Sequence, residues 1–312
     1  MRELIRIGIG AFAAAALAAC ATVLVGHGEE GIPPGPPPAI ARSAGGDEAL
    51  PVIDAHLHVN FAGKVDPTSG LPDTRAELAA EMKRNHVVGA VAMAHAGDAY
   101  EDLSDLGVIQ CVGLGAEVDA AALEADLAPG RYRCIKVYLG YVHRYAYDPA
   151  YEPAYRLAAR YHVPVVFHTG DTDSTKAKLK YADPLTIDEV AVDHPDVTFV
   201  IAHCGNPWIE SAAEVAYKNP NVVLDGSAFL VGDLRATSPE QIETYLVTPL
   251  RWIFGYVEDP SKLMFGTDWP LVEIGPYLEA FKRAIPREHW RAVLHDNAAR
   301  VYSITTPSEA AR

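Results

Sequence analysis

Six residues whose side chains could bind a metal ion stand at or near the ends of short apolar runs. They are His56, His58, Lys136, His168, His203 and Asp268. Strand side chains alternate between two faces, so His56 and His58 can point the same way and hold one ion. Imidazole nitrogens and carboxylate oxygens together suit Zn²⁺, Mn²⁺, Fe²⁺ or Co²⁺. These residue types and their spacing therefore predict a metal site.

The elements that must position these side chains are β-branched runs that alternate with helical patterns from residue 51 onward. The expected strands are Val52–His58, Val87–Ala94, Val108–Leu114, Cys134–Tyr138, Val163–His168, Val197–His203, Val222–Leu224 and Leu263–Gly266. The expected helices are 74–85, 119–127, 151–161, 187–193, 207–218, 239–254, 276–284 and 287–294. Such alternation predicts a parallel sheet covered by helices, and eight units fit one α/β domain, a (β/α)₈ TIM barrel over residues 50–312. An open doubly wound sheet is the alternative, although no Gly-x-Gly-x-x-Gly motif supports nucleotide binding.

In such a barrel the carboxyl ends of all strands meet at one mouth, which brings the six residues together. Burying their charges among apolar side chains would be costly without a partner, and a divalent cation supplies one. Taken singly, His168 or His203 reads as a hydrogen-bonded core histidine and Lys136 as a salt-bridge lysine. The joint pattern is what favours a metal site.

The first fifty residues form a separate region. Residues 1–25 contain two early arginines and then the uncharged apolar run Ile7–Val25, which is typical of a secretory signal. The motif Leu17-Ala18-Ala19-Cys20 resembles a bacterial lipoprotein signal, in which cleavage leaves a lipidated Cys20. An uncleaved membrane anchor and a plain cleaved signal are the alternatives. Residues 26–49 are rich in Pro and Gly and predict a linker. We therefore expect an exported, membrane-attached protein of the cell envelope or periplasm.

Composition excludes several classes of protein and of binding partner. With 49% hydrophobic residues and 21% charged residues the chain is not disordered, and its net charge of −15 opposes nucleic-acid binding. The four cysteines include no Cys-x-x-Cys pair, which excludes a disulfide scaffold and a cysteine zinc site. Cys111, Cys134 and Cys204 lie in apolar runs and are expected to be buried free thiols. A Cys111–Cys134 bridge is the alternative in an oxidising compartment. A homo-oligomer is left open.

Several motifs together resemble those of the amidohydrolase superfamily, in its amidohydrolase-related group of metal-dependent TIM-barrel hydrolases. They are Asp54-Ala55-His56-Leu57-His58, Val166-Phe167-His168, Ile201-Ala202-His203-Cys204-Gly205, Gly266-Thr267-Asp268-Trp269-Pro270 and the closing segment 295–302, together with Lys136 in its strand. The resemblance covers residues 51–305. It implies a divalent metal, with Zn²⁺ as the first choice and Mn, Fe or Co as others, and it does not specify the substrate.

The resemblance implies one of two metal arrangements. The two-metal version uses all six residues, with a carboxylated Lys136 bridging both ions and with His168 and His203 holding the second. The one-metal version binds its ion through His56, His58, His168 and Asp268. His203 then acts on the substrate, and Lys136 remains an unmodified lysine.

A mechanism follows from general chemistry. A bound ion lowers the pKa of water from about 15.7 to about 7, so that water can attack a carbonyl carbon. Asp268 would act as base and then as acid, while His203 or Lys136 would stabilise the developing oxyanion. Asp54 is expected to orient a histidine from behind.

Three further residues are expected to contact the substrate. They are Tyr138, Arg144 and Trp269. Arg144 could hold a carboxylate or phosphate through paired hydrogen bonds. The first functional hypothesis is a hydrolase of an amide, lactone or ester bond in a small molecule. The alternatives are a decarboxylase or hydratase of the same superfamily and an exported binding protein without catalysis.

Overall fold

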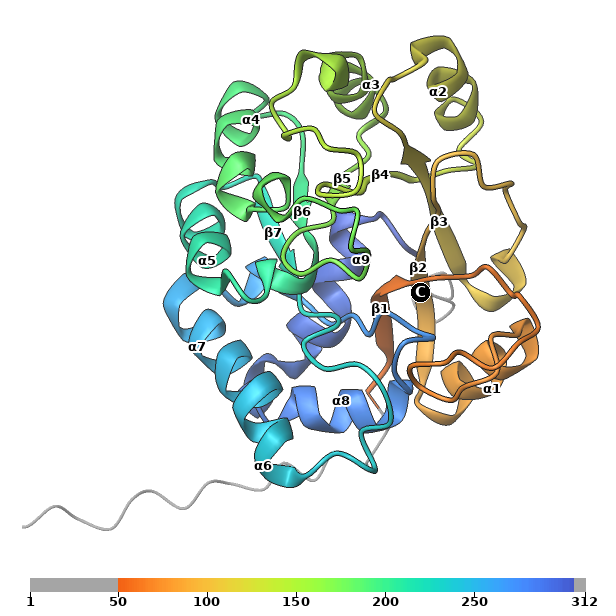
Figure 1. Ribbon diagram of the computed structural model, residues 1–312, viewed down its shortest axis with the longest axis vertical. Helices are drawn as coiled ribbons and strands as arrows, with labels where there is room; N and C mark the ends of the chain where they lie inside the picture. Colours follow the sequence, from red (N-terminus) through yellow and green to blue (C-terminus); the bar gives the residue numbers. More distant parts are fainter. Residues whose placement is uncertain (1–49, 306–312) are drawn as a thin grey trace, which may run out of the picture. The chain divides into compact units, whose positions relative to one another are not determined.

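A computed structural model describes residues 50–305 of the chain (Figure 1). Its eight strands are β1 (Val52–Leu57), β2 (Val87–Met93), β3 (Val108–Leu114), β4 (Cys134–Val137), β5 (Val165–Phe167), β6 (Phe199–Ile201), β7 (Val222–Asp225) and β8 (Leu263–Met264). The nine α-helices of this part are α1 (Arg75–Arg84), α2 (Ala120–Leu127), α3 (Glu152–Tyr161), α4 (Ile187–Asp193), α5 (Ile209–Lys218), α6 (Pro239–Ile242), α7 (Thr248–Val257), α8 (Ile274–Lys282) and α9 (Asn297–Val301). In Figure 1 the helices surround the strands, as expected of a barrel.

The strands pair in parallel in the order of the sequence, from β1 to β8. The chain just after β8 returns to β1 and nearly closes the sheet. There the Ala55 amide donates to the Phe265 carbonyl at 2.9 Å, and the Asp268 amide donates to the His56 carbonyl at 2.8 Å. The predicted TIM barrel is confirmed, and the open doubly wound sheet is excluded.

Local sequence explains where several helices begin and end. The Thr74 hydroxyl accepts from the Glu77 amide and starts α1, and the Asp119 carboxylate caps α2 in the same way. The helix expected over 239–254 is present as one continuous helical run that consists of α6, a π-helical turn at Glu243–Val247, and α7, which ends at Val257. Pro249 lies in the first turn of α7 and has no N–H to donate backward, which accounts for the local irregularity.

Alternation along each strand divides the core into two parts. In β4, Cys134 packs inside the barrel, while Ile135 and Val137 pack outward against the helices. The inside of the barrel is filled by alternate residues of the strands and by residues of α9 and its end, including Val301 and Ile304. The last helix therefore supplies part of the barrel interior.

Cys111 and Cys134 form a disulfide between the neighbouring strands β3 and β4, so the expectation that both are free thiols is wrong. The two residues are direct partners in the strand register, their Cα atoms are 4.3 Å apart, and both side chains are fully buried. Cys204 is a buried free thiol, as expected. The structure thus has the bridge that the sequence analysis gave as the alternative, which sequence alone could not decide because it gives no register between strands.

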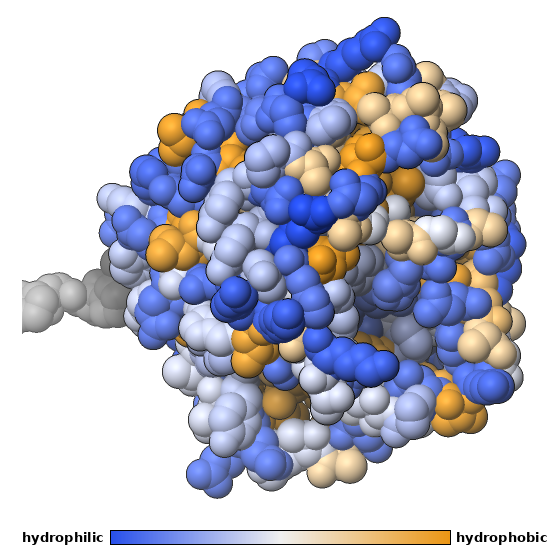
Figure 2. Space-filling view, turned by 45° about the horizontal axis from the view of Figure 1, so that its top comes forward, coloured by the Kyte–Doolittle hydropathy of each residue, from blue (hydrophilic) through white to orange (hydrophobic). Residues whose placement is uncertain are grey.

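The described surface is largely hydrophilic on the face shown in Figure 2, with hydrophobic side chains scattered over it in small groups. Among residues 50–305, no helix is both long and apolar enough to cross a bilayer. The expected signal or anchor at 1–25 and the linker at 26–49 lie outside the described residues.

Candidate metal centre

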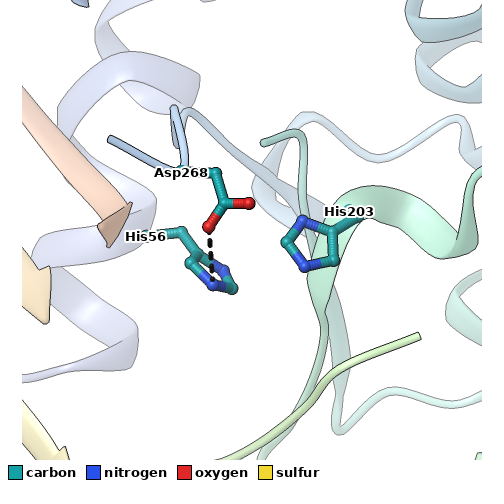
Figure 3. A group of neighbouring side chains, drawn as sticks. All are labelled: His56, His203 and Asp268. Carbon is teal, nitrogen blue, oxygen red and sulfur yellow. Dashed lines mark ion pairs between the residues drawn. The ribbon is translucent and has the colours of Figure 1, made fainter. Parts of the chain in front are cut away.

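Three of the predicted ligands come together at the mouth of the barrel. His56 of β1, His203 after β6 and Asp268 after β8 offer ligand atoms that all lie within 4.8 Å of one another. Figure 3 shows these side chains pointing toward one another from separate segments of the chain. All three are buried, and Asp268 Oδ1 lies 3.5 Å from His56 Nε2. The convergence of strand ends thus produces a compact group of nitrogen and oxygen donors.

His58 lies on the edge of this group. Its Nε2 atom is 3.0 Å from Asp268 Oδ1, and its Nδ1 atom is 3.1 Å from the Met93 carbonyl at the end of β2. The ring centroids of His56 and His58 are 5.6 Å apart. The alternation of β1 therefore places both imidazoles on the same side, as the sequence predicted.

His168 and Lys136 also face the cluster. His168 Nδ1 lies 3.2 Å from His203 Nε2, and its Nε2 donates to the Asp171 carbonyl at 2.9 Å. Lys136 is fully buried, with Nζ 3.4 Å from His56 Nε2 and 5.0 Å from the centre of the Tyr138 ring. All six predicted residues therefore lie in or beside one cluster.

The backbone turns sharply where two of these side chains enter the site. His203 has φ 59°, the next residue Cys204 has φ 45°, and Asp268 has φ 73°. L-residues rarely adopt this left-handed region, and such residues concentrate at functional sites. The turns after β6 and β8 direct His203 and Asp268 into the mouth of the barrel.

Burial controls the protonation of the cluster. Burial lowers the pKa of His203 to about 4 and the pKa of Lys136 to about 8, and it lowers the pKa of His168. Burial would raise the pKa of Asp268, but the close polar contact with His58 and the charges of the neighbouring imidazoles outweigh it and hold that pKa well below its usual range. The His58 Nε2 atom lies 3.0 Å from Asp268 Oδ1 but is not oriented to make a hydrogen bond with it. At neutral pH, His168 and His203 are therefore neutral imidazoles and Asp268 is an ionised carboxylate.

One acceptor in the cluster lacks a hydrogen bond. Asp268 Oδ1 is buried and has no hydrogen-bond partner among the described residues, although two imidazoles stand within 3.5 Å of it. A buried carboxylate oxygen without a donor is costly, and a cation between it and the imidazole nitrogens would satisfy it. The donor set thus fits a divalent metal ion.

Two residues that the sequence analysis missed support the histidines. The carboxylate of Asp225, at the end of β7, lies 2.8 Å from His56 Nδ1, and the Ser227 hydroxyl lies 2.8 Å from His203 Nδ1. Asp54 was expected to orient a histidine from behind. Its carboxylate contacts His56 through the backbone amide, at 3.1 Å, and not through the ring. It also accepts from the Thr267 hydroxyl at 2.6 Å and from the Thr267 amide, so it ties β1 to the turn after β8. Asp225 occupies a strand end like the predicted ligands, which was the signal available.

The predicted substrate residues have different surroundings. Tyr138 faces the mouth between His95 and His168, with its ring 4.5 Å from the His95 ring. Trp269 is fully buried and packs against Phe61, away from solvent. Of these residues, Tyr138 is the best placed to touch a bound molecule.

Arg144 does not present a free guanidinium. It pairs with Asp148 at 2.9 Å and also with Glu117, so its charge is already neutralised by two carboxylates. This geometry does not favour the anion-binding role expected for Arg144. The sequence could not show these partners, because Glu117 belongs to another loop of the barrel.

Solved structures with the same fold come from several bacteria, all at low identity. A Bordetella bronchiseptica TIM-barrel protein is 19% identical, with a TM-score of 0.61, over 84% of this chain and 100% of the other. A Burkholderia multivorans amidohydrolase with bound zinc is 17% identical, with a TM-score of 0.61, over 82% and 100%. A 5-carboxyvanillate decarboxylase from Sphingomonas paucimobilis is 14% identical, with a TM-score of 0.57, over 82% and 100%. These likenesses show the fold.

The sequence itself identifies the family. No curated relative matches the chain. The sequence profile of the amidohydrolase family matches residues 53–304. This range includes all the residues of the cluster and all eight strands, apart from the first residue of β1. The chain therefore belongs to the amidohydrolase family, within a superfamily of TIM-barrel enzymes.

Proposed function

We propose that this protein is a metal-dependent hydrolase that cleaves an amide, lactone or ester bond in a small molecule. The observation that carries the proposal is the buried group of His56, His203 and Asp268, with an Asp268 oxygen left without a donor. Family membership supports an enzyme, and the superfamily includes hydrolases and decarboxylases. A binding protein without catalysis would not need to keep all the predicted ligand positions, and this chain has each of them.

His56, His203 and Asp268 would hold the ion, with His58 and His168 beside them. Zn²⁺ suits this mixture of imidazole and carboxylate donors, and Mn²⁺, Fe²⁺ or Co²⁺ can use the same ligands. When bound, a divalent ion supplies an activated water at neutral pH and polarises the substrate oxygen.

The residues of the chain supply proton transfer and charge stabilisation. Asp268 is ionised and faces the histidines of the cluster, so it can accept the proton of the attacking water and pass it to the leaving group. Lys136 Nζ is buried next to the cluster, where its positive charge would stabilise an oxyanion far more than it could in water. The Tyr138 ring forms part of the wall against which the rest of the substrate would pack.

Lys136 also determines how many ions the centre holds. Because burial lowers the pKa of this amine to about 8, an appreciable fraction is neutral near pH 7.5, and the neutral amine is the form that can react with carbon dioxide. A carboxylated Lys136 would add a bridging ligand and favour two ions. An unmodified Lys136 would favour one.

The test is metal content per chain, measured by mass spectrometry on protein purified without a histidine tag. The chain would then be stripped by chelation and reloaded with Zn²⁺ or Mn²⁺. We expect about one or two ions and metal-dependent hydrolysis in a panel of lactones, esters and amides. The matched control is Asp268→Asn, which should fold and lose turnover. Absence of bound metal even after reloading would refute the proposal, and release of CO₂ from carboxylic acids in place of hydrolysis would make the protein a decarboxylase.

We also propose that the protein acts outside the cytoplasm, attached to a membrane through Cys20. The Cys111–Cys134 disulfide supports an oxidising compartment. Cell fractionation tests this directly. Full-length protein should sediment with membranes, and Cys20→Ser should release it, whereas a soluble cytoplasmic full-length protein would contradict the proposal.

A further inference from the structure

His56 and His203 each use Nδ1 to bond to a residue behind the cluster and turn Nε2 toward the other ligands. His56 Nδ1 lies 2.8 Å from Asp225 Oδ2, and His203 Nδ1 lies 2.8 Å from Ser227 Oγ. On the other side, His56 Nε2 faces Asp268, and His203 Nε2 faces His168. Both Nε2 atoms therefore point into the candidate metal centre.

The direction of each hydrogen bond follows from what the groups can donate. An ionised carboxylate only accepts, so His56 must donate its Nδ1 proton to Asp225. The Ser227 hydroxyl has a single proton and bonds to Asp225 Oδ1, so its oxygen must accept the Nδ1 proton of His203. A proton on each Nδ1 leaves an electron pair on each Nε2, which is the form that binds a metal. His168 donates from Nε2 to the Asp171 carbonyl, so its Nδ1 also carries an electron pair and faces that of His203 Nε2 at 3.2 Å. Two electron pairs that face each other repel, and a cation bound by both nitrogens would satisfy them.

We propose that Asp225, acting directly on His56 and through Ser227 on His203, is the positioning residue that fixes the tautomers of both imidazoles. One carboxylate at the end of β7 thereby prepares two ligands that come from different strands. This inference rests on the proposed metal-dependent function. It gives β7 a part in the site, for which the sequence analysis had named no residue of this strand.

The surroundings of Asp225 leave no substitute for these bonds. Asp225, Ser227 and His56 are fully buried, and the Asp225 carboxylate also accepts from the Ser227 amide at 3.1 Å. The residue between them must be glycine, because a Cβ on Gly226 would lie 2.6 Å from Phe281 Cε2 of α8. The turn is thus packed tightly against α8 and holds Asp225 and Ser227 in place.

The tautomers can be measured without metal. In the stripped protein, ¹⁵N NMR of the histidine side chains should show the proton of both His56 and His203 on Nδ1. In Ser227→Ala, His203 should lose this preference while His56 keeps it. Protons on Nε2 in the wild type would overturn the inference, whether or not the protein binds metal.

Zn²⁺ affinity, measured by competition with a chelator, gives the second readout. Removing a partner that orients a ligating histidine should weaken binding by about 10–100-fold, so we expect this for Ser227→Ala and a larger loss for Asp225→Asn. Because Asp225 acts on His203 through Ser227, adding Ser227→Ala to Asp225→Asn should change the Zn²⁺ affinity little further, by less than about threefold, whereas the effects of two independent packing defects would multiply.

Cys204→Ala is the matched control. Cys204 is equally buried and donates from Sγ to the Asp225 backbone carbonyl at 3.2 Å, so it touches the same residue without touching its carboxylate. The Zn²⁺ affinity of the Cys204→Ala protein should stay within about threefold of that of the wild type. Equal losses in Cys204→Ala and Ser227→Ala would show a general packing effect and overturn the inference. A wild type with Nδ1 protons that binds no Zn²⁺ would instead refute the proposed function alone.

Discussion

The disulfide between β3 and β4 should contribute strongly to the stability of the barrel. Cys111 and Cys134 are separated by 23 positions, so the bridge closes a short segment of the unfolded chain. Loop-closure entropy for a segment of this length corresponds to about 3.4 kcal/mol at 25 °C. We therefore expect reduction of the bridge to lower the free energy of unfolding by about that amount.

The assay is equilibrium unfolding in guanidinium chloride, followed by tryptophan fluorescence, with and without reductant. With a slope of about 6 kcal/mol per M, reduction should move the midpoint down by about 0.6 M. Cys111→Ala/Cys134→Ala should unfold at a midpoint no higher than that of the reduced wild type, and reductant should not shift it further. Cys204→Ala should retain the full response to reductant, because its thiol is free.

Two results would refute this reasoning. Coincident unfolding curves for the oxidised and reduced wild type would show that the bridge does not constrain the unfolded chain. Alkylation of the denatured protein without reductant is the second check. Labelling of Cys111 and Cys134 to the same extent as Cys204 would show that the bridge is absent. We expect alkylation to label Cys204 and to spare the bridged pair.

Three other predictions concern single side chains. Asp268→Asn should lower kcat by about 10²–10⁴-fold with an unchanged circular dichroism spectrum, and near-normal turnover would remove Asp268 from proton transfer. Burial raises the pKa of Glu81 above its ordinary 4.5, so the folded protein binds this proton more tightly than the unfolded chain does. The free energy of unfolding therefore decreases as the pH rises past 4.5. Glu81→Gln, which can still accept from the Ile274 amide, should therefore gain stability over the wild type as pH rises, and parallel denaturation profiles would contradict this. Arg144→Ala should change KM by less than about twofold because two carboxylates already occupy the guanidinium, and a tenfold rise would return Arg144 to the substrate site.

The barrel and most of the cluster could be predicted because both depend on short-range patterns. The period of two in β1 placed His56 and His58 on one face, and the alternation of strands with helices placed their partners at one mouth. Local signals also gave most helix positions, such as the cap at Thr74. These features need no knowledge of how distant segments align.

The features that sequence reasoning missed or left open depend on how distant segments of the chain align in the fold. The bridge between Cys111 and Cys134 requires the register of β3 against β4. Asp225 looked like the start of a loop because β7 was expected to end at Leu224, and only the closed barrel shows that it reaches His56. Arg144 likewise appeared available until the fold brought Glu117 beside it.

The closure of the barrel by its last elements has a consequence for biosynthesis. β1 obtains its second neighbour only from the chain after β8, and Val301 and Ile304 fill the interior next to strand residues such as Ile53. Until the ribosome has made β8 and the segments that follow it, the first strand has one open edge and the interior is incomplete. Such a chain completes its folding only after synthesis of α9. A nascent barrel of this design therefore stays incompletely folded until α9 has left the ribosome.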